Sequence, residues 1–210
     1  MAKRGNLFVI SGPTAAGKGT ICAKLCERRE DIRLSVSCAT RAPRKGEIDG
    51  THYFFISDEQ FDAMIQGDEL LEFANVHGKK YGTPLRFVMD NLEKGIDVLL
   101  EIDVQGAQQV INKKIPLTPV FVIPPSKQEL LSRLRSRGTE TEEQIATRLR
   151  TAREEMRVAD HYDYIIVNEE LDSAVKMLES IIDASHAQKA EHMTLLQALN
   201  QQFQELDSQV

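Results

Sequence analysis

The chain has 210 residues and a formal net charge of −6, with 41% hydrophobic and 28% charged residues. These values are typical of a globular protein, and they argue against broad binding to nucleic acid or to an anionic membrane surface. Any phosphate site must therefore be a local concentration of positive charge in an acidic molecule.

The pattern of apolar residues and cysteines favours a reducing compartment. Neither the first ten residues nor any later segment holds an apolar run close to the ~20 residues of a membrane span. The three cysteines have no disulfide-framework spacing. Cys22 and Cys26 lie four residues apart, and we interpret them as small core residues, because a structural metal site normally needs four ligands. The sequence predicts a cytoplasmic protein without membrane or nucleic-acid partners.

The first predicted elements are a buried strand and a helix. Leu7–Ser11 is a short apolar run that ends at Gly12 and Pro13, which indicates a strand that enters a turn. From Lys18 to Arg29 apolar residues recur at helical spacing.

Further along, three more buried strands alternate with helices. The strands are predicted over 98–102, 120–123 and 164–167, and the helices over about 104–113, 126–135, 142–158 and 171–190. This alternation implies parallel crossovers and hence a three-layer α/β core, formed by residues 1–34 and 91–190. Residues 35–90 break the rhythm and predict an inserted, mixed α+β lobe. The tail, 191–210, predicts an amphipathic helix that packs on the body or on another subunit.

The turn after the first strand matches a phosphate-binding loop. It follows a strand and opens a helix, which is the context that a Gly-x4-Gly-Lys match requires. Glycines let backbone N–H groups converge on one anion at the positive end of a helix, and the lysine adds a mobile full charge. The motif therefore indicates a nucleoside triphosphate rather than a plain glycine-rich turn. Its residues are Gly12, Pro13, Thr14, Ala15, Ala16, Gly17, Lys18, Gly19 and Thr20.

One position departs from the usual loop. Gly19 stands where most P-loops place the Ser or Thr that holds Mg²⁺, and Thr20 is the nearest hydroxyl. We therefore expect Mg²⁺ to be held largely through water and phosphate oxygens, with Thr20 and Glu101 as the candidate protein contacts.

Several further motifs resemble those of guanylate kinases, over roughly residues 6–185. The motifs are Ser37–Glu47, Gly50–Phe55, Glu69–Ala74, Tyr81–Thr83, Glu101–Ala107, Pro124–Ser126, Arg137–Glu143 and Val167–Leu171. The resemblance implies a P-loop NTPase core with a parallel sheet, an inserted GMP-binding lobe at 35–90 and a helical lid at about 133–150. It also implies direct, in-line transfer of the γ-phosphate of ATP to GMP, with Mg²⁺ as cofactor and with dGMP accepted as well.

The resemblance assigns eight residues to the acceptor. Four would hold the GMP phosphate, namely Arg41, Arg44, Tyr53 and Tyr81, and four would contact the guanine, namely Ser37, Glu72, Thr83 and Asp103. The chemistry agrees, because arginine forks pair with phosphate through two charge-assisted bonds. A carboxylate can accept from guanine N1–H and the 2-amino group together, which adenine does not offer. The Thr83 hydroxyl would donate to guanine O6.

The resemblance also implies roles in the transfer step. Lys18, Arg137 and Arg148 would be catalytic, Arg133 would contact ATP, and Asn168 would lie beside the adenine. Phosphoryl transfer needs positioning and positive charge rather than a protein nucleophile. We interpret two neighbouring arginines, Arg135 and Arg150, as surface residues that pair with nearby glutamates.

Two other functions fit part of the pattern. A kinase acting on a ribose bisphosphate would need the P-loop and lid but neither Glu72 nor Thr83. An interaction module related to guanylate kinases would bind a protein through the acceptor lobe, and such modules tend to carry damaged P-loops and companion domains. The intact Lys18 argues against the module, and we expect no companion domain in a chain of this length. The tail favours a homo-oligomer.

Overall fold

The computed structural model describes residues 4–76, 78–136 and 141–207. Its centre is a five-stranded sheet with the order β2-β7-β1-β8-β9, in which every neighbouring pair is parallel. The carboxyl ends of parallel strands meet at one edge, so the segments that follow β1 and β7 lie side by side there. The strands are β1 (Leu7–Ser11), β2 (Ile32–Leu34), β7 (Asp97–Glu101), β8 (Thr118–Ile123) and β9 (Tyr164–Val167).

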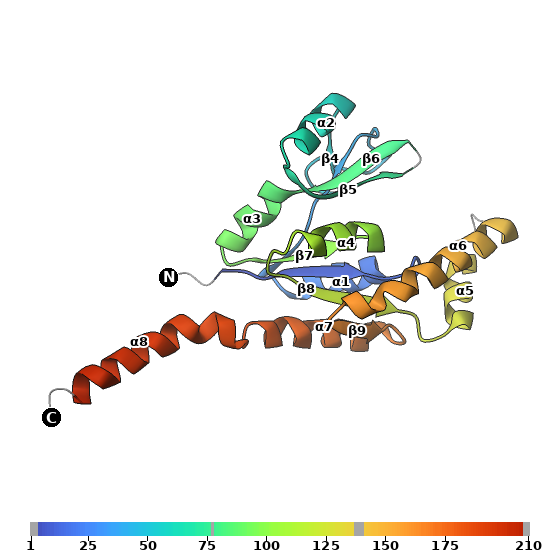
Figure 1. Cartoon of the computed structure of the whole chain (residues 1–210). Helices are drawn as coiled ribbons and strands as arrows, with labels where there is room; N and C mark the ends of the chain where they lie inside the picture. Colours follow the sequence, from blue (N-terminus) through green and yellow to red (C-terminus); the bar gives the residue numbers. More distant parts are fainter. Residues whose placement is uncertain (1–3, 77, 137–140, 208–210) are drawn as a thin grey trace.

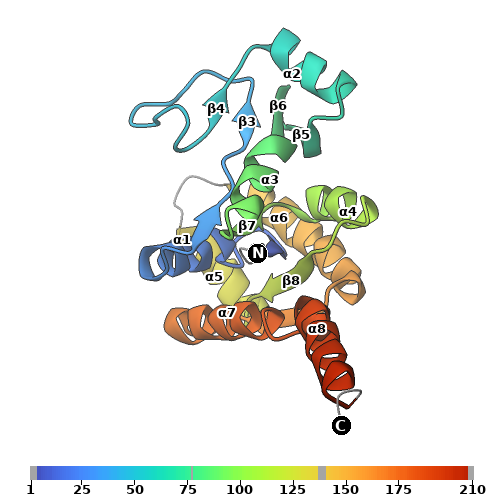
Figure 2. The same cartoon turned by 90° about the vertical axis from the view of Figure 1, so that its left-hand side faces the viewer.

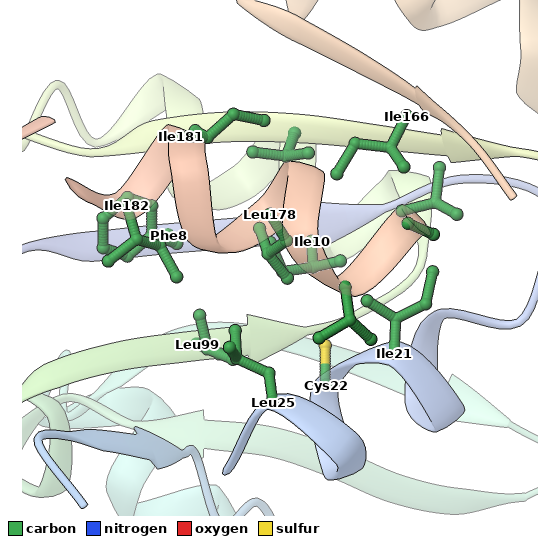
Figure 3. Close-up of a cluster of buried hydrophobic side chains, with 14 of the residues drawn as sticks. Phe8, Ile10, Ile21, Cys22, Leu25, Leu99, Ile166, Leu178, Ile181 and Ile182 are labelled. Carbon is green, nitrogen blue, oxygen red and sulfur yellow. The ribbon is translucent and has the colours of Figure 1, made fainter. Parts of the chain in front are cut away.

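Helices cover both faces of this sheet (Figures 1 and 2). α1 (Lys18–Arg28) and α7 (Leu171–Ser185) pack on one face, and α3 (Leu85–Glu93) and α4 (Val104–Asn112) pack on the other. Each face of the sheet has its own hydrophobic core, and β1 contributes side chains to both. Phe8 and Ile10 point to the first face, and Leu7 and Val9 point to the second. Figure 3 shows the first core, in which Phe8 and Ile10 lie among side chains of α1 and α7.

A second, smaller sheet has the order β4-β3-β6-β5. Its strands are β3 (Cys38–Ala39), β4 (Phe54–Phe55), β5 (Leu70–Val76) and β6 (Lys79–Pro84), and α2 (Asp58–Gln66) packs on it through the buried Phe61. Ser57 begins α2 with a capping box, in which its side chain and that of Gln60 each accept from the other's backbone N–H. The whole sheet and α2 lie within residues 35–90, so this segment has the predicted mixed α+β character, although α3 begins within it and packs on the main sheet.

β5 contains a bulge that matters for the site. Leu70 lies opposite Pro84 and Phe73 opposite Gly82, so β5 takes three steps where β6 takes two. The extra residue turns successive side chains inward. Leu71 joins the core between the main sheet and helices α3 and α4, and Glu72 becomes buried, with 7% of its surface exposed.

The predicted core strands and helices are confirmed, with three corrections. β9 was predicted as buried, but Ile165 and Val167 are 54% and 51% exposed, because β9 is the sheet's edge and has a neighbour on one side only. β2 was missed, since a three-residue strand carries almost no periodic signal. The helix predicted over 142–158 is α6 (Glu142–Glu155), continued by a 3₁₀ turn, Met156–His161. α5 (Lys127–Ser136) precedes it.

The end of α7 also differs from the prediction. α7 ends at Ser185 rather than near 190, and α8 (Lys189–Asp207) follows after a short turn. α8 points away from the body in both views (Figures 1 and 2), so of the two predicted alternatives the structure does not show packing on the body, and packing on another subunit stays a prediction. Its apolar residues are exposed, among them Leu195, Leu199 and Phe203. Within the described ranges, no helix is long and apolar enough to cross a membrane.

A buried polar network ties the end of α7 to the start of β1. Asp97 is 2% exposed, accepts from the Asn6 backbone N–H at 2.7 Å, and lies 2.8 Å from His186 Nε2. The Asn6 side chain donates to Ser185 Oγ at 3.0 Å. The turn after α7 is therefore fixed by hydrogen bonds to the sheet.

We expect Asp97→Ala to lower the free energy of unfolding by about 2–3 kcal/mol, because it removes a buried carboxylate that binds both the Asn6 backbone N–H and the His186 ring. Urea unfolding would measure the change. Asp183→Ala is the control, since Asp183 pairs with Arg29 at the surface and its loss should matter by less than about 1 kcal/mol. Equal effects of the two substitutions would contradict this account.

Candidate functional site

The loop between β1 and α1 has a backbone that only some residues can adopt. Gly12 and Gly17 have φ angles of 138° and 92°. A Cβ at Gly12 would lie 2.1 Å from the Val122 carbonyl oxygen, and one at Gly17 would lie 2.3 Å from Asn168 Nδ2. Both positions therefore require glycine. The loop encloses a cavity of about 270 Å³ that Lys18, Thr20 and Glu101 help to line.

Lys18 folds back over this loop. Its Nζ donates to the carbonyl oxygens of Gly12 and Pro13, at 2.7 and 3.1 Å. Burial lowers the pKa of Lys18, while the negative charges of Glu101, Glu155 and Asp103 act in the opposite direction. The ammonium group is thus held at the mouth of the loop by carbonyl oxygens and surrounding carboxylates.

Ala15 sits in the left-handed region, with φ 60°, where an L side chain is strained. We expect Ala15→Gly to raise the free energy of unfolding by about 0.5–1 kcal/mol, as the relief of strain exceeds the extra chain entropy of glycine. Thermal unfolding would measure the change. Ala16→Gly serves as the control and should destabilise, because it removes a buried methyl group. A lower Tm for Ala15→Gly would contradict the assignment of strain.

Two of the predicted site residues brace the loop from outside. Asn168 Nδ2 donates to the Ala16 carbonyl at 2.8 Å. Arg133 donates to the same carbonyl at 3.3 Å and to the Asn168 carbonyl at 2.8 Å, and it pairs with Glu129. Both side chains therefore hold the phosphate loop to the carboxyl ends of the strands.

Two side chains of α6 make hydrogen bonds to Thr14 of the loop. Arg148 donates to the Thr14 hydroxyl at 3.4 Å, and Glu155 accepts from the Thr14 backbone N–H at 3.1 Å. Arg148 and Glu155 lie seven residues apart and so share a face of α6. Burial raises the pKa of Glu155. Glu155 was not predicted as a site residue, although its spacing of seven residues from Arg148 on a predicted helix places both side chains on one face.

The remaining arginines of the predicted lid differ in their interactions. Arg137 lies outside the described residues. Arg135 pairs with Glu142 at 3.0 Å, as predicted, whereas Arg150 donates to the Thr147 hydroxyl instead of to a glutamate.

The second group of side chains centres on Glu72. Thr83 is fully buried and its hydroxyl donates to Glu72 Oε1 at 2.7 Å. Burial raises the pKa of Glu72, and the nearby charge of Asp103 adds to the effect. Asp103 follows β7 and begins α4, where its side chain accepts from the Gly106 N–H at 2.8 Å. Sequence analysis gave Thr83 a donor role toward a ligand, but in the structure its single proton already goes to Glu72.

The third group centres on Arg41. Its guanidinium makes a two-bond ion pair with Glu47, at 2.6 and 2.7 Å, and donates to the Tyr81 hydroxyl at 3.2 Å. The Tyr53 ring lies 5.0 Å from the guanidinium carbon, within cation–π range. The ion pair, with help from the Arg44 backbone N–H, lowers the pKa of Glu47 to about 2.

This third group agrees only in part with the sequence analysis. Arg41, Tyr53 and Tyr81 come together as predicted, but Arg44 reaches the cluster through its backbone, and its side chain is exposed. Glu47 was not given a role, although it stands in the same motif. Ser37 lies just before β3, where its carbonyl accepts from the Phe54 N–H.

Comparison with known proteins decides the family. The family model described as guanylate kinase matches residues 4–185. The chain belongs to the guanylate kinase family. A guanylate kinase of Caldanaerobacter subterraneus subsp. tengcongensis is 50% identical over 87% of this chain and 88% of its own length. One from Halalkalibacterium halodurans is 46% identical over 89% and 92%.

A solved structure supports the fold as well. The crystal structure of guanylate kinase from Anaplasma phagocytophilum matches with a TM-score of 0.75 and 32% identity, covering 96% of each chain. The resemblance to guanylate kinases, which the motifs predicted, is confirmed, as is the α/β class with its parallel sheet. The P-loop, Glu72 and Arg41 groups are therefore parts of a guanylate kinase fold.

Proposed function

We propose that this protein transfers the γ-phosphate of ATP to GMP, giving ADP and GDP, with dGMP as a second acceptor. One observation carries the proposal. β7 pairs with β1, so Asp103, which follows β7, lies at the same sheet edge as the phosphate loop, and Gly106 of the helix that Asp103 begins lies against the Glu72 carboxylate. The γ-phosphate of ATP in the phosphate loop would then face the phosphate of a GMP bound at Glu72, as in-line transfer requires.

On the ATP side, the backbone N–H groups of the loop and the start of α1 would hold the phosphates. Lys18 would exchange the Gly12 and Pro13 carbonyls for phosphate oxygens. We propose that Arg148 and Arg137 place positive charge on the transferring group and that Arg133 and Asn168 hold the loop in place beside the nucleotide. The protein then supplies position and charge, and no covalent intermediate on a side chain is needed.

The residues present suit Mg²⁺ bound mainly through its substrate. Glu101 is the last residue of β7, and its Oε2 would lie 3.6 Å from a Cβ added at Gly19. Thr20 is exposed at the start of α1. No group of three His, Cys, Asp or Glu that could hold a metal occurs within the described parts of the chain. Oxygen donors, few of them from protein, are typical of Mg²⁺ with a nucleotide. When bound, Mg²⁺ would neutralise negative charge on the phosphates.

On the acceptor side, we propose that Glu72 accepts from guanine N1–H and the 2-amino group, with Ser37, Thr83 and Asp103 around it. Arg41, Arg44, Tyr53 and Tyr81 would hold the GMP phosphate, and Arg41 would exchange Glu47 for it. The GMP phosphate would thus displace the ion pair between Arg41 and Glu47, and the guanine would bind to the Glu72 carboxylate that already accepts from Thr83.

A coupled assay of ADP release tests the proposal. Purified protein would receive ATP with or without Mg²⁺ and with GMP, dGMP, AMP, CMP, UMP or ribose 1,5-bisphosphate. We expect turnover with GMP and dGMP, dependent on Mg²⁺. Turnover with ribose 1,5-bisphosphate instead of GMP would refute GMP as the acceptor and indicate a ribose bisphosphate kinase. Absence of turnover with every acceptor would favour an interaction module.

We also propose bounds for the lobe and the lid, a cytoplasmic location and assembly into a homo-oligomer. The GMP-binding lobe is assigned to 35–90 and the lid to about 133–150. The thiols of Cys22, Cys26 and Cys38 are all unbonded, which suits the cytoplasm. The exposed apolar side chains of α8 favour pairing with a second copy, and sedimentation of Phe203→Glu against the unchanged protein would test this.

A further inference from the structure

The bulge in β5 leaves the backbone next to Glu72 outside the ladder with β6. β5 is the edge strand of its sheet, and Glu72 sits in the irregular stretch between the paired residues Leu70 and Phe73. A strand edge with a bulge is a weakly held piece of backbone. The direction of the Glu72 side chain therefore needs support from another element.

α4 supplies that support through one side-chain amide. Gln109 Oε1 accepts from the Phe73 N–H at 3.1 Å, and Gln109 Nε2 donates to the Phe73 carbonyl at 2.9 Å. Two antiparallel strands exchange the same pair of bonds between opposite residues. The amide thus replaces a neighbouring strand at the residue that follows Glu72. The views agree on this placement, since α4 lies on the side of the main sheet that faces β5 (Figures 1 and 2).

The same face of α4 also limits where the Glu72 carboxylate can lie. Gly106 is three residues before Gln109, and a Cβ at Gly106 would lie 2.9 Å from Glu72 Oε2 and 3.4 Å from Glu72 Cδ. Gly106 is helical, so alanine would suit its backbone and the helix itself. Its lack of a side chain provides the space that the carboxylate occupies.

We propose that Gln109 and Gly106 are positioning residues for the base-reading carboxylate. Gln109 fixes the β5 backbone beside Glu72, and Gly106 admits the carboxylate against α4, next to Thr83. The inference rests on the proposed function, because it gives Glu72 the task of pairing with guanine. A displacement of the carboxylate by even 1 Å would weaken both bonds to the base and misplace the acceptor phosphate.

Steady-state kinetics on two variants and one control test the proposal. Gln109→Met removes both bonds but keeps the length of the side chain and the helix propensity. Gly106→Ala leaves Gln109 unchanged and moves the carboxylate directly. Gln108→Met is the control, because Gln108 lies on the same helix but bonds to Asn112 and His161. GMP and AMP would be compared as acceptors, and KM for ATP and Tm would be measured for each protein.

We expect Gln109→Met to raise KM for GMP about tenfold, as expected for two neutral hydrogen bonds, and to lower the GMP-to-AMP ratio of kcat/KM by a similar factor. KM for ATP should stay within about twofold, since the phosphate loop is untouched. Gly106→Ala should show the same loss with an equal or higher Tm. The control should resemble the unchanged protein.

Other outcomes would overturn the proposal. If both variants bind and select GMP like the unchanged protein, the carboxylate does not depend on α4. If KM for ATP rises in parallel with KM for GMP, or if Gln108→Met behaves like Gln109→Met, the role is general stability. If Gln109→Met does not fold, Gly106→Ala decides alone. Absence of GMP turnover in the unchanged protein would instead refute the proposed function, and this inference with it.

Discussion

Lys18→Ala is expected to lower kcat by at least about 10³-fold, because the substitution removes the one full charge that the loop can place on the β- and γ-phosphates. GMP affinity should change by less than about twofold, since within the described residues no hydrogen bond or ion pair joins Lys18 to Glu72 or Arg41. Single-turnover kinetics and calorimetric titration with GMP would measure the two quantities.

Lys24→Ala provides the matched control for this experiment. Lys24 lies on the same helix and pairs with Asp172 at the surface, at 2.7 Å. Its removal should leave turnover within about twofold. Retention of more than a tenth of the activity in Lys18→Ala would refute the catalytic role of Lys18.

Glu72→Gln is expected to lower the preference for GMP over AMP by at least about 10²-fold. The amide keeps one acceptor but turns an N–H₂ group toward the guanine 2-amino group, and that N–H₂ can donate to adenine N1. The ratio of kcat/KM for the two acceptors would measure the change. KM for ATP should stay the same, and an unchanged ratio would exclude Glu72 as the base-reading group.

The same substitution should not harm the fold. Burial and Asp103 raise the pKa of Glu72, so the ionised carboxylate is less favourable in the folded than in the unfolded chain. At pH values above the ordinary glutamate pKa, this difference lowers the stability of the fold. An uncharged glutamine removes it, and we expect Tm to be unchanged or higher. Loss of selectivity with retained stability would separate function from folding.

The elements of the main sheet could be predicted because their signals are local. Leu7–Ser11 is an unbroken apolar run that stops at Gly12, and Lys18 opens a periodic helix, so neither assignment needed distant contacts. β2 and the exposure of β9 were not predictable in this way. A three-residue strand has too few positions for a period, and an edge is defined only by the order of strands.

The residues of the site could be predicted better than their interactions. Glu72, Thr83 and Arg41 stand in motifs that resemble those of guanylate kinases, and the structure places Glu72 beside Thr83 and Arg41 beside Tyr53 and Tyr81. The pairing of Thr83 with Glu72 and the amide bonds of Gln109 join separate segments and depend on a bulge, whereas the ion pair of Arg41 with Glu47 depends on how one loop folds back on itself. One extra residue in β5 decides which side chains point inward, and no period in the sequence records it.

The ion pair between Arg41 and Glu47 bears on which phosphates the protein would accept. With a pKa of about 2, Glu47 keeps its single negative charge at any physiological pH. A ligand must therefore replace one anion by another, and a phosphodiester, with one charge, gains little from the exchange. A terminal phosphate monoester carries about 1.5 to 2 charges at neutral pH and gains the difference. If Arg41 binds the acceptor phosphate as proposed, the carboxylate would discriminate by charge against nucleotides that are linked through their phosphates, as in a polynucleotide chain.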